Sequence, residues 1–231
     1  ASEIKPMGVG INVQPNAVRE LFELGLENQL SVIGIKTKEF GTFTKKGLEV
    51  WKELRGTWVG YKWSQYSVYC SKLLVMLYEN LIKRAGNQCI EIGWKADNFI
   101  NHEDNVTLNL VSSDGSEKRT LKDTVLIGVD GIHSNIRSQI ILNEGDPFGV
   151  LRVLWRGITT GKPFLSGSTM IMIGQATRRF VAYPISNIDK DTDLQRINWI
   201  AELSFDPTKG WKRNDWNREA HTDVFLPNFL N

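Results

Sequence analysis

The chain has 231 residues and a mass of 26.3 kDa, enough to bury a sizeable core as one large domain or two small ones. Its hydrophobic fraction of 41% and charged fraction of 23% are those of an ordinary globular protein, and they exclude a disordered or fibrous chain. The 28 basic and 26 acidic residues give a formal charge of +2, which predicts neither a nucleic-acid partner nor a charged membrane surface.

The cysteines, the histidines and the first residues narrow the class of protein further. Two cysteines, Cys70 and Cys89, are too few for a disulfide framework and indicate free thiols in a reducing compartment. The three histidines show no ligand spacing, so no metal site is expected. No apolar run approaches the ~20 residues that span a bilayer, and no leader pattern precedes the chain's first elements. We therefore expect a cytoplasmic protein with no membrane partner.

The first third of the chain mixes helices and extended segments. Residues 15–25 carry apolar side chains at spacings of three and four and end in glycine, which predicts a short helix. Residues 30–40 and 42–44 are rich in β-formers and are broken by glycines, which predicts a hairpin. The clearest helix is predicted over residues 70–84. Its apolar stripe consists of Leu73, Leu74, Leu77, Leu81 and Ile82.

A region of alternating apolar and polar residues follows this helix. Segments 88–101 and 105–111 alternate like an antiparallel hairpin, and a turn then leads to a third strand around 117–121. This meander runs into the apolar segment Val125–Val129. Its continuous apolar character predicts a strand covered on both faces, as in a parallel sheet.

An Asp-Gly pair stands at the carboxyl end of that predicted strand, the edge at which open α/β sheets bind ligands. Gly131 permits a tight turn and close approach of a ligand, and Asp130 precedes it. Ser134 is a candidate helix cap, and Arg137, three residues later, can meet a phosphate or a carboxylate. The segment predicts a nucleotide-cofactor loop, and an ordinary strand, turn and helix with an Asp turn residue is the alternative.

After residue 142 the pattern changes to short strands with no long amphipathic helix between them, which predicts an antiparallel sheet. Four such strands are expected, at residues 151–158, 169–173, 180–183 and 196–203. A short helix is expected within 214–225. The breakers at 145–147 mark the predicted domain boundary, which gives domains of residues 1–146 and 147–231.

Three parts of the chain, taken in order, carry a family resemblance. They are residues 8–26, residues 128–137 around the Asp-Gly pair, and the strand segments 155–157, 180–186 and 197–199. Together they resemble the single-component FAD-dependent aromatic hydroxylases, the family of para-hydroxybenzoate and salicylate hydroxylases. The resemblance covers essentially the whole chain.

The resemblance implies an α/β fold in which an incomplete FAD-binding Rossmann-like domain, with inserted strands, precedes an antiparallel-sheet substrate domain. It also implies FAD and NADPH or NADH as cofactors, and a small aromatic substrate that the reduced flavin and oxygen hydroxylate. Asp130, Gly131 and Arg137 become the expected cofactor-binding residues, and no catalytic side chain is assigned. Assembly into a homo-oligomer is left open.

For other side chains near these motifs, a structural role is the alternative to a functional one. Tyr183 and Trp155 are candidates for stacking on an aromatic substrate, although an aromatic residue on a short strand is more often part of the core. His133, in the Asp-Gly loop, is more often a loop residue bonded to backbone than an acid or base.

The chain also departs from the family pattern. Its sequence contains neither the Gly-x-Gly-x-x-Gly loop on which the FAD pyrophosphate would rest nor the family's second flavin segment, a Gly-Asp pair followed by an Ala-His-Pro-like run downstream of the substrate sheet. Where an arginine is expected at the start of the long helix the chain has Cys70, and Lys72 points in a different direction. We therefore expect a fragment of a monooxygenase. A flavin-free remnant kept as a binding or interaction module is the alternative, and a nicotinamide-dependent reductase would need the same glycine loop.

Overall fold

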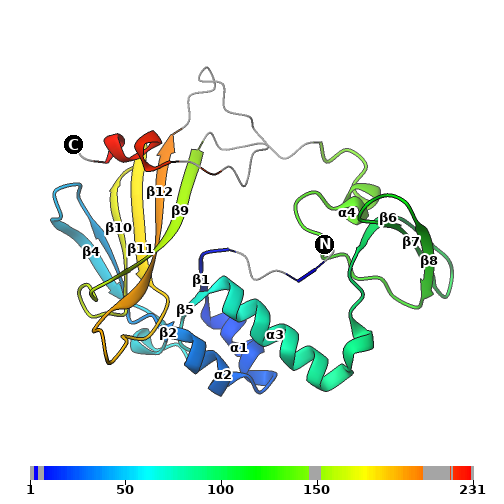
Figure 1. Ribbon diagram of the computed structural model, residues 1–231, viewed down its shortest axis with the longest axis horizontal. Coiled ribbons are helices and arrows are strands. Elements are labelled where there is room, and N and C mark those ends of the chain that lie inside the picture. Colours follow the sequence, from blue (N-terminus) through cyan, green and yellow to red (C-terminus); the bar gives the residue numbers. More distant parts are fainter. Residues whose placement is uncertain (1–2, 5–7, 146–151, 205–218, 220, 230–231) are drawn as a thin grey trace. The chain divides into compact units, whose positions relative to one another are not determined.

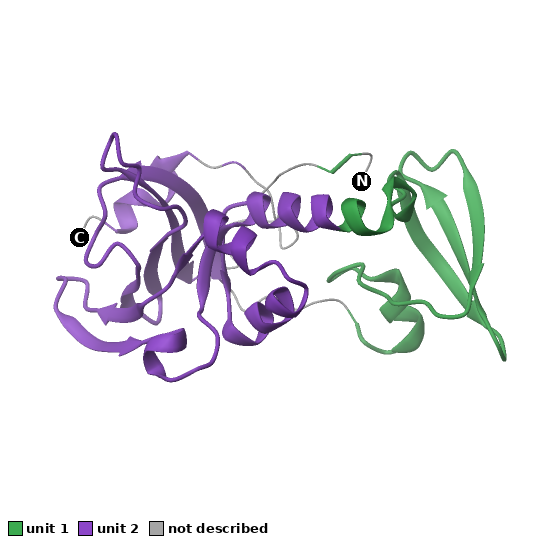
Figure 2. Ribbon diagram, turned by 90° about the horizontal axis from the view of Figure 1, so that it is seen from below, with its two compact units in different colours: residues 1–5, 81–148 green, residues 6–80, 149–231 purple. Residues whose placement is uncertain are grey.

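The computed structural model in Figure 1 describes residues 3–4, 8–145, 152–204, 219 and 221–229. The chain forms two compact units, coloured separately in Figure 2, of which the smaller consists of residues 1–5 and 81–148. The larger unit consists of residues 6–80 and 149–231, so an early segment of the chain groups with the later strands. The roles assigned to residues 1–146 and 147–231 remain a prediction.

The first helix of the larger unit is the one expected over residues 15–25. Helix α1 (Pro15–Glu23) begins with a proline, whose fixed φ suits the first helical position. Gly25 ends the helical segment in the left-handed region at a φ of 70°, and its N–H donates to the carbonyl of Phe22 at 2.8 Å. The predicted glycine stop is therefore confirmed in its physical detail.

The strand predicted from residue 30 begins later than expected. Residues 30–33 belong to helix α2 (Glu27–Ile33), and strand β2 covers only Gly34–Lys36. Leu26 and Leu30 project from this turn of helix into the core, with exposed fractions of 2% and 0%. Burial of these two leucines outweighs the β-propensity of the neighbouring residues, which is a weak preference.

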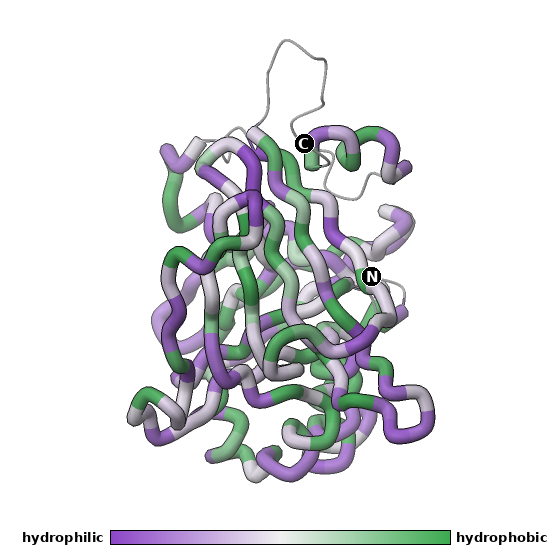
Figure 3. Tube along the Cα trace, turned by 90° about the vertical axis from the view of Figure 1, so that its left-hand side faces the viewer, coloured by the Kyte–Doolittle hydropathy of each residue, from purple (hydrophilic) through white to green (hydrophobic). Residues whose placement is uncertain are grey.

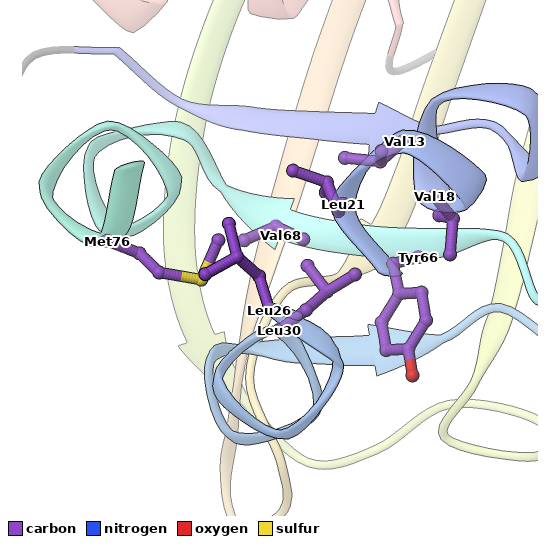
Figure 4. Close-up of a cluster of buried hydrophobic side chains, with 8 residues drawn as sticks. All are labelled: Val13, Val18, Leu21, Leu26, Leu30, Tyr66, Val68 and Met76. Atoms are coloured by element: carbon purple, nitrogen blue, oxygen red, sulfur yellow. The ribbon is translucent and has the colours of Figure 1, made fainter. Parts of the chain in front are cut away.

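A small sheet supports the helices of the larger unit. Its order is β1 (Gly10–Val13), β5 (Tyr66–Tyr69) and β2, and both pairings are antiparallel. Figure 4 shows side chains from β1 and β5, from α1, from α2 and the residue before it, and from the long helix α3 (Cys70–Ala85) meeting in one apolar cluster. The cluster contains Val13, Val18, Leu21, Leu26, Leu30, Tyr66, Val68 and Met76.

Helix α3 confirms the helix predicted over residues 70–84, but its apolar stripe is not buried. Met76 is the buried apolar side chain of the helix, and Leu73 is partly buried. Leu74, Leu77 and Leu81 are 40%, 37% and 45% exposed. The helix therefore carries an apolar face that the described residues cover only in part.

The larger unit also contains a six-stranded sheet in the order β4-β3-β10-β11-β12-β9. Its strands are β3 (Glu39–Phe43), β4 (Glu49–Leu54), β9 (Arg152–Gly161), β10 (Thr169–Gln175), β11 (Arg178–Pro184) and β12 (Gln195–Ser204). All four strands predicted after residue 142 are present, and Figure 3 shows both hydrophobic and hydrophilic residues along the sheet. The pairing is antiparallel except between β3 and β10. There Glu39 accepts a hydrogen bond from the Thr169 hydroxyl at 2.6 Å.

The smaller unit contains the predicted meander. Its strands are β6 (Trp94–Asn101), β7 (Val106–Ser112) and β8 (Lys118–Asp123), followed by helix α4 (Asn135–Ile140). The hairpin strand expected from residue 88 begins only at Trp94, because Asn87–Cys89 form a 3₁₀ turn (η2). A further 3₁₀ turn, η1, covers Gly56–Val59 in the larger unit.

The buried strand predicted at residues 125–129 is wrong for this chain. No described segment pairs with these residues, and Val125, Ile127 and Val129 are 70%, 78% and 88% exposed. A strand exists only when a neighbour takes up its backbone hydrogen bonds, and a suitable sequence does not supply that neighbour.

Half of the segment 214–225, in which the closing helix is predicted, falls outside the described residues. The part that the structure describes contains two 3₁₀ turns, η4 (Thr222–Val224) and η5 (Leu226–Asn228). Across the described chain, no helix is both long and apolar enough to cross a bilayer.

Replacing Leu30 by alanine tests the small core in Figure 4. Leu30 has no exposed surface, so Leu30→Ala is expected to lower the free energy of unfolding by about 2–5 kcal/mol through lost burial and a residual cavity. Val32→Ala in the same helix is the control, because Val32 is 75% exposed, and a change within about 0.5 kcal/mol is expected. Urea denaturation followed by circular dichroism measures both, and equal effects would contradict the assigned core.

Candidate functional site

The Asp130 carboxylate is held by residues of its own loop. One oxygen accepts the hydroxyl hydrogen of Ser134, and the other accepts the N–H groups of Asn135 at 2.9 Å and Ile136 at 3.4 Å. The Ser134 hydroxyl is the main reason that the pKa of Asp130 lies below its ordinary value. The carboxylate is therefore ionised at neutral pH, and about one of its roughly four acceptor positions remains free.

Ser134 has a second role in the same loop. Its side-chain oxygen accepts the N–H of Arg137 at 2.9 Å, which caps helix α4. The predicted cap is confirmed, and it couples the start of the helix to the Asp130 carboxylate through one hydroxyl group.

Gly131 gives the loop an open turn. Its φ of 84° lies in the left-handed region, and a Cβ built at this position would meet no atom within 4 Å. Asp130 and Gly131 line an open hollow of about 770 Å³ in the smaller unit, together with the turn at residues 101–106. Asn105 also lines it, and its side-chain oxygen is buried without a hydrogen-bond partner among the described residues.

Arg137 closes the loop from the other side. Its guanidinium donates to the carbonyl of Gly131 at 2.8 Å and to that of Ile132 at 2.6 Å, and its Nε lies 2.7 Å from the Glu144 carboxylate. The structure thus brings the three predicted residues, Asp130, Gly131 and Arg137, into one loop. Arg137 is engaged by protein acceptors, so here it positions the loop, and its contact with a cofactor stays a prediction.

A second polar cluster lies in the larger unit, where β1 meets the six-stranded sheet. The N–H of Gly10 donates to the side-chain oxygen of Asn198 at 2.7 Å, and Asn198 is fully buried. A Cβ at Gly10 would lie 2.7 Å from the Asn198 Cβ and 2.8 Å from a ring carbon of Tyr183. Only glycine therefore allows β1 to approach the sheet this closely.

Tyr183 is the ionisable group of this cluster. It is 3% exposed, and burial raises its pKa to about 12, although the charge of Arg156 opposes the shift. The phenol is therefore neutral at physiological pH and can act as a hydrogen-bond donor. Cys70 is close enough to raise the same pKa, and it begins α3 as predicted, with its N–H donating to the carbonyl of Val9 at 2.9 Å.

The remaining candidates lie elsewhere. Trp155 stacks on Phe225 at a centroid distance of 5.3 Å and belongs to an aromatic cluster on the sheet face opposite to Tyr183, since its row in the register runs through Ala201 and Phe180. His133 is exposed in the turn before α4. No group of metal-ligating side chains occurs among the described residues.

The match to a family model defines the class of protein, which is the FAD-binding class. Residues 5–224 match the model of the FAD binding domain, and the chain belongs to this family of FAD-dependent aromatic hydroxylases. Over 231 residues it is 29% identical to phenazine 1,6-dicarboxylic acid hydroxylase PhzS of Lysobacter antibioticus. The aligned region covers 99% of this chain and 57% of that protein. The FAD-dependent monooxygenase pynG of Aspergillus niger is 23% identical over 152 residues, which cover 64% of this chain and 33% of that protein.

Solved structures show the same mixed α/β fold, which confirms the predicted fold class. Klebsiella pneumoniae HpxO, complexed with FAD and uric acid, superposes with a TM-score of 0.72 at 17% identity and covers 98% of this chain and 54% of that chain. A 2,6-dihydroxypyridine-3-hydroxylase from Arthrobacter nicotinovorans gives a TM-score of 0.62 at 20% identity, over 87% of this chain and 48% of that chain. The chain thus spans about half the length of such relatives.

Sequence reasoning found the Asp130 loop and missed the contact between Gly10 and Asn198. The loop is local, with all its partners between residues 130 and 144. Gly10 and Asn198 are 188 residues apart. The available signal was an asparagine between Ile197 and Trp199 on a strand, because a buried amide in an apolar strand needs a partner.

Removing the Ser134 hydroxyl tests the loop. Ser134→Ala is expected to raise the pKa of Asp130 toward its ordinary value and to cost about 0.5–2 kcal/mol through the lost cap. A carboxyl group with a lowered folded pKa stabilises the fold above its unfolded pKa, and this stabilisation disappears as pH falls through the folded pKa. The variant should therefore lose less stability on acidification. Carbon NMR titration of Asp130 measures the shift, with Ser138→Ala as control and an unchanged Asp130 titration in Ser134→Ala as the contrary result.

Adding one methyl group at Gly10 tests the second cluster. Gly10→Ala is expected to destabilise the larger unit by about 1–3 kcal/mol, because its Cβ overlaps two buried side chains. Gly161→Ala is the control, since its Cβ would lie 3.6 Å from Ile197, an ordinary contact. Thermal unfolding compares them. A Gly10→Ala protein as stable as the control would show that β1 does not pack against Asn198.

Proposed function

We propose that the chain is part of an FAD-dependent, NAD(P)H-using monooxygenase that hydroxylates a small aromatic substrate. The observation that carries the proposal is the Asp130 loop, in which an ionised carboxylate with a free acceptor position stands beside an open glycine turn. These residues fit the sugar hydroxyls of a dinucleotide cofactor, which donate hydrogen bonds and need close backbone approach.

Each part of the loop has a distinct task in this proposal. Asp130 accepts a hydroxyl hydrogen of the cofactor, Gly131 leaves room for it, and Arg137 holds the turn through the carbonyl groups of residues 131 and 132. FAD, when bound, supplies the redox chemistry with a nicotinamide nucleotide and oxygen, and the protein supplies placement and electrostatics.

One face of the six-stranded sheet suits an aromatic substrate. In the register, Arg156, Ile200, Val181 and Met172 form one row across four strands, and Ile158, Asn198 and Tyr183 form the neighbouring row on the same face. The aliphatic members are half-buried and Arg156 is exposed. An apolar surface with one exposed guanidinium favours an aromatic acid.

The names of the relatives agree with that substrate class. PhzS is named as a hydroxylase of phenazine 1,6-dicarboxylic acid, and HpxO was solved with uric acid. Phenazine 1,6-dicarboxylic acid and uric acid are both acidic ring compounds. We therefore extend the proposal to an aromatic acid whose charged group meets Arg156.

Uncovered apolar surface supports the view that this chain works as part of a longer protein. The segment Val125–Val129 exposes three β-branched side chains by 70–88%, and α3 exposes Leu74, Leu77 and Leu81. A strand and an amphipathic helix normally bury such faces. Since the chain spans 57% of PhzS, further cofactor-domain elements are the natural cover for both faces.

A flavin-free binding module is the alternative function. Cys70 stands where the family resemblance expects an arginine, and the sequence lacks the glycine loop for the pyrophosphate. Both features weaken FAD binding by this chain alone.

A flavin titration separates the two functions. We expect little quenching of FAD fluorescence by the 231-residue chain, and tight binding by a longer chain produced by extending the reading frame in both directions. In that longer chain Asp130→Asn should weaken FAD binding by about tenfold, the value of one charged hydrogen bond, while Asp123→Asn should not. A longer chain that stays colourless and binds no FAD, or a frame closed by stop codons, would favour the flavin-free module.

The uncovered faces predict self-association of the isolated chain. Ile127→Lys is expected to shift sedimentation velocity profiles toward monomer, because it interrupts an apolar edge that is open to pairing with another copy. Val32→Lys, at a position 75% exposed on α2, serves as the matched control and should leave the profile unchanged. A well-dispersed monomer with a sharp unfolding transition before any substitution would contradict the prediction.

A further inference from the structure

A second hollow, of about 570 Å³, lies in the larger unit. It is lined by the end of α2, by β2, and by the loops around residues 167 and 187–190. None of Gly10, Tyr183 and Asn198 contributes to its lining. The hollow is therefore separate from the cluster beside β1 and needs its own explanation.

The first unusual feature of this hollow is the side chain of Gln195, which is 2% exposed. Its Nε2 donates to the carbonyl groups of Gly167 and Ser186, both at 3.2 Å. These two bonds fix which end of the amide is which, so the Oε1 atom is the one left over. Oε1 is buried and has no hydrogen-bond partner among the described residues. Buried acceptors nearly always have a donor, so this atom calls for one from outside the described residues.

The second feature is the positive charge around the hollow. Lys36 and Lys190 both line it and both are exposed, and within the described part of the chain neither has a carboxylate within ion-pair distance. Asp189, beside Lys190, is turned into its own loop, where it accepts the N–H groups of Asp191 and Thr192 at 3.0 Å. It is therefore occupied by other donors.

Hydroxyl groups complete the polar lining. The phenol of Tyr66, a side chain with no exposed surface, lies 3.1 Å from the Ser31 hydroxyl, and both residues line the hollow. A hydroxyl pair can turn to donate or to accept, so it adapts to whichever group lies next to it.

We propose that this hollow binds a small oxyanion that carries its own hydroxyl group. The anionic oxygens meet Lys36 and Lys190, and the hydroxyl donates to Oε1 of Gln195. Hydrogen phosphate and small hydroxycarboxylates share this chemistry. An anion without a hydroxyl satisfies the lysines and leaves the buried acceptor unpaired, which costs binding energy.

The test compares anions that differ in the hydroxyl. The ¹⁵N-labelled 231-residue chain is titrated at mildly acidic pH with phosphate and sulfate, and separately with glycolate and acetate. Saturable chemical-shift changes of the Gly34 and Gly167 amides and of the Gln195 side-chain amide are expected with phosphate, glycolate or both. Comparison of these two titrations shows whether the hollow prefers a phosphate or a hydroxycarboxylate. Sulfate and acetate are expected to bind about tenfold more weakly, as the loss of one hydrogen bond to a buried acceptor requires.

Substitution of the two lysines that line the hollow tests whether the anion binds there. Lys36→Gln and Lys190→Gln are each expected to weaken binding by about tenfold, because a charged hydrogen bond is lost. Lys46→Gln, an exposed lysine in the turn between β3 and β4, is the control. Equal binding of anions with and without the hydroxyl, no saturable shift at these amides, or equal behaviour of all three variants would overturn the proposal, and water would then be the partner of Gln195.

Discussion

The packing of β1 against the six-stranded sheet depends on one hydrogen bond, from the N–H of Gly10 to the side chain of Asn198. It joins the first described strand to a strand near the end of the chain, 188 residues away, with the acceptor fully buried. The bond needs a glycine, because a Cβ would overlap both Asn198 and Tyr183. This approach covers the row of the sheet that contains Tyr183 and Asn198, whereas Arg156, in the neighbouring row of the proposed substrate face, is exposed.

The sequence predicts those parts of the structure that are held by contacts between residues close together in the chain, and it fails where the contacts join distant residues. The Asp130 loop was predictable because a carboxylate, a cap and an arginine within eight positions, from residue 130 to residue 137, can find one another in any surrounding fold. The same holds for α1 and α3, where spacing and a glycine stop act locally. Residues 30–33 failed as a strand because two leucines gain more from burial in a distant core than β-propensity offers.

The contact between Gly10 and Asn198 could not be predicted, because the sequence around each residue does not indicate which residue is its partner. The segment Val125–Val129 is the reverse case, in which a local pattern predicts a strand that does not form. Its composition is that of a buried strand, and without a pairing neighbour among the described residues it forms no strand and is 70–88% exposed at its β-branched positions. Composition specifies what a segment can become, and the neighbouring segments decide whether it does.

The intact Asp130 loop does not by itself distinguish a part of an enzyme from a flavin-free module. Its bonds come from residues 134–137, so the loop keeps its geometry whether or not a cofactor sheet stands beside it. The apolar surface is the better discriminator. A module selected to stand alone gains nothing from Val125, Ile127 and Val129 in water, and polar residues there would protect it from association. Retention of three β-branched residues therefore supports the proposal that this segment belongs in a completed sheet, next to the loop that would hold the cofactor.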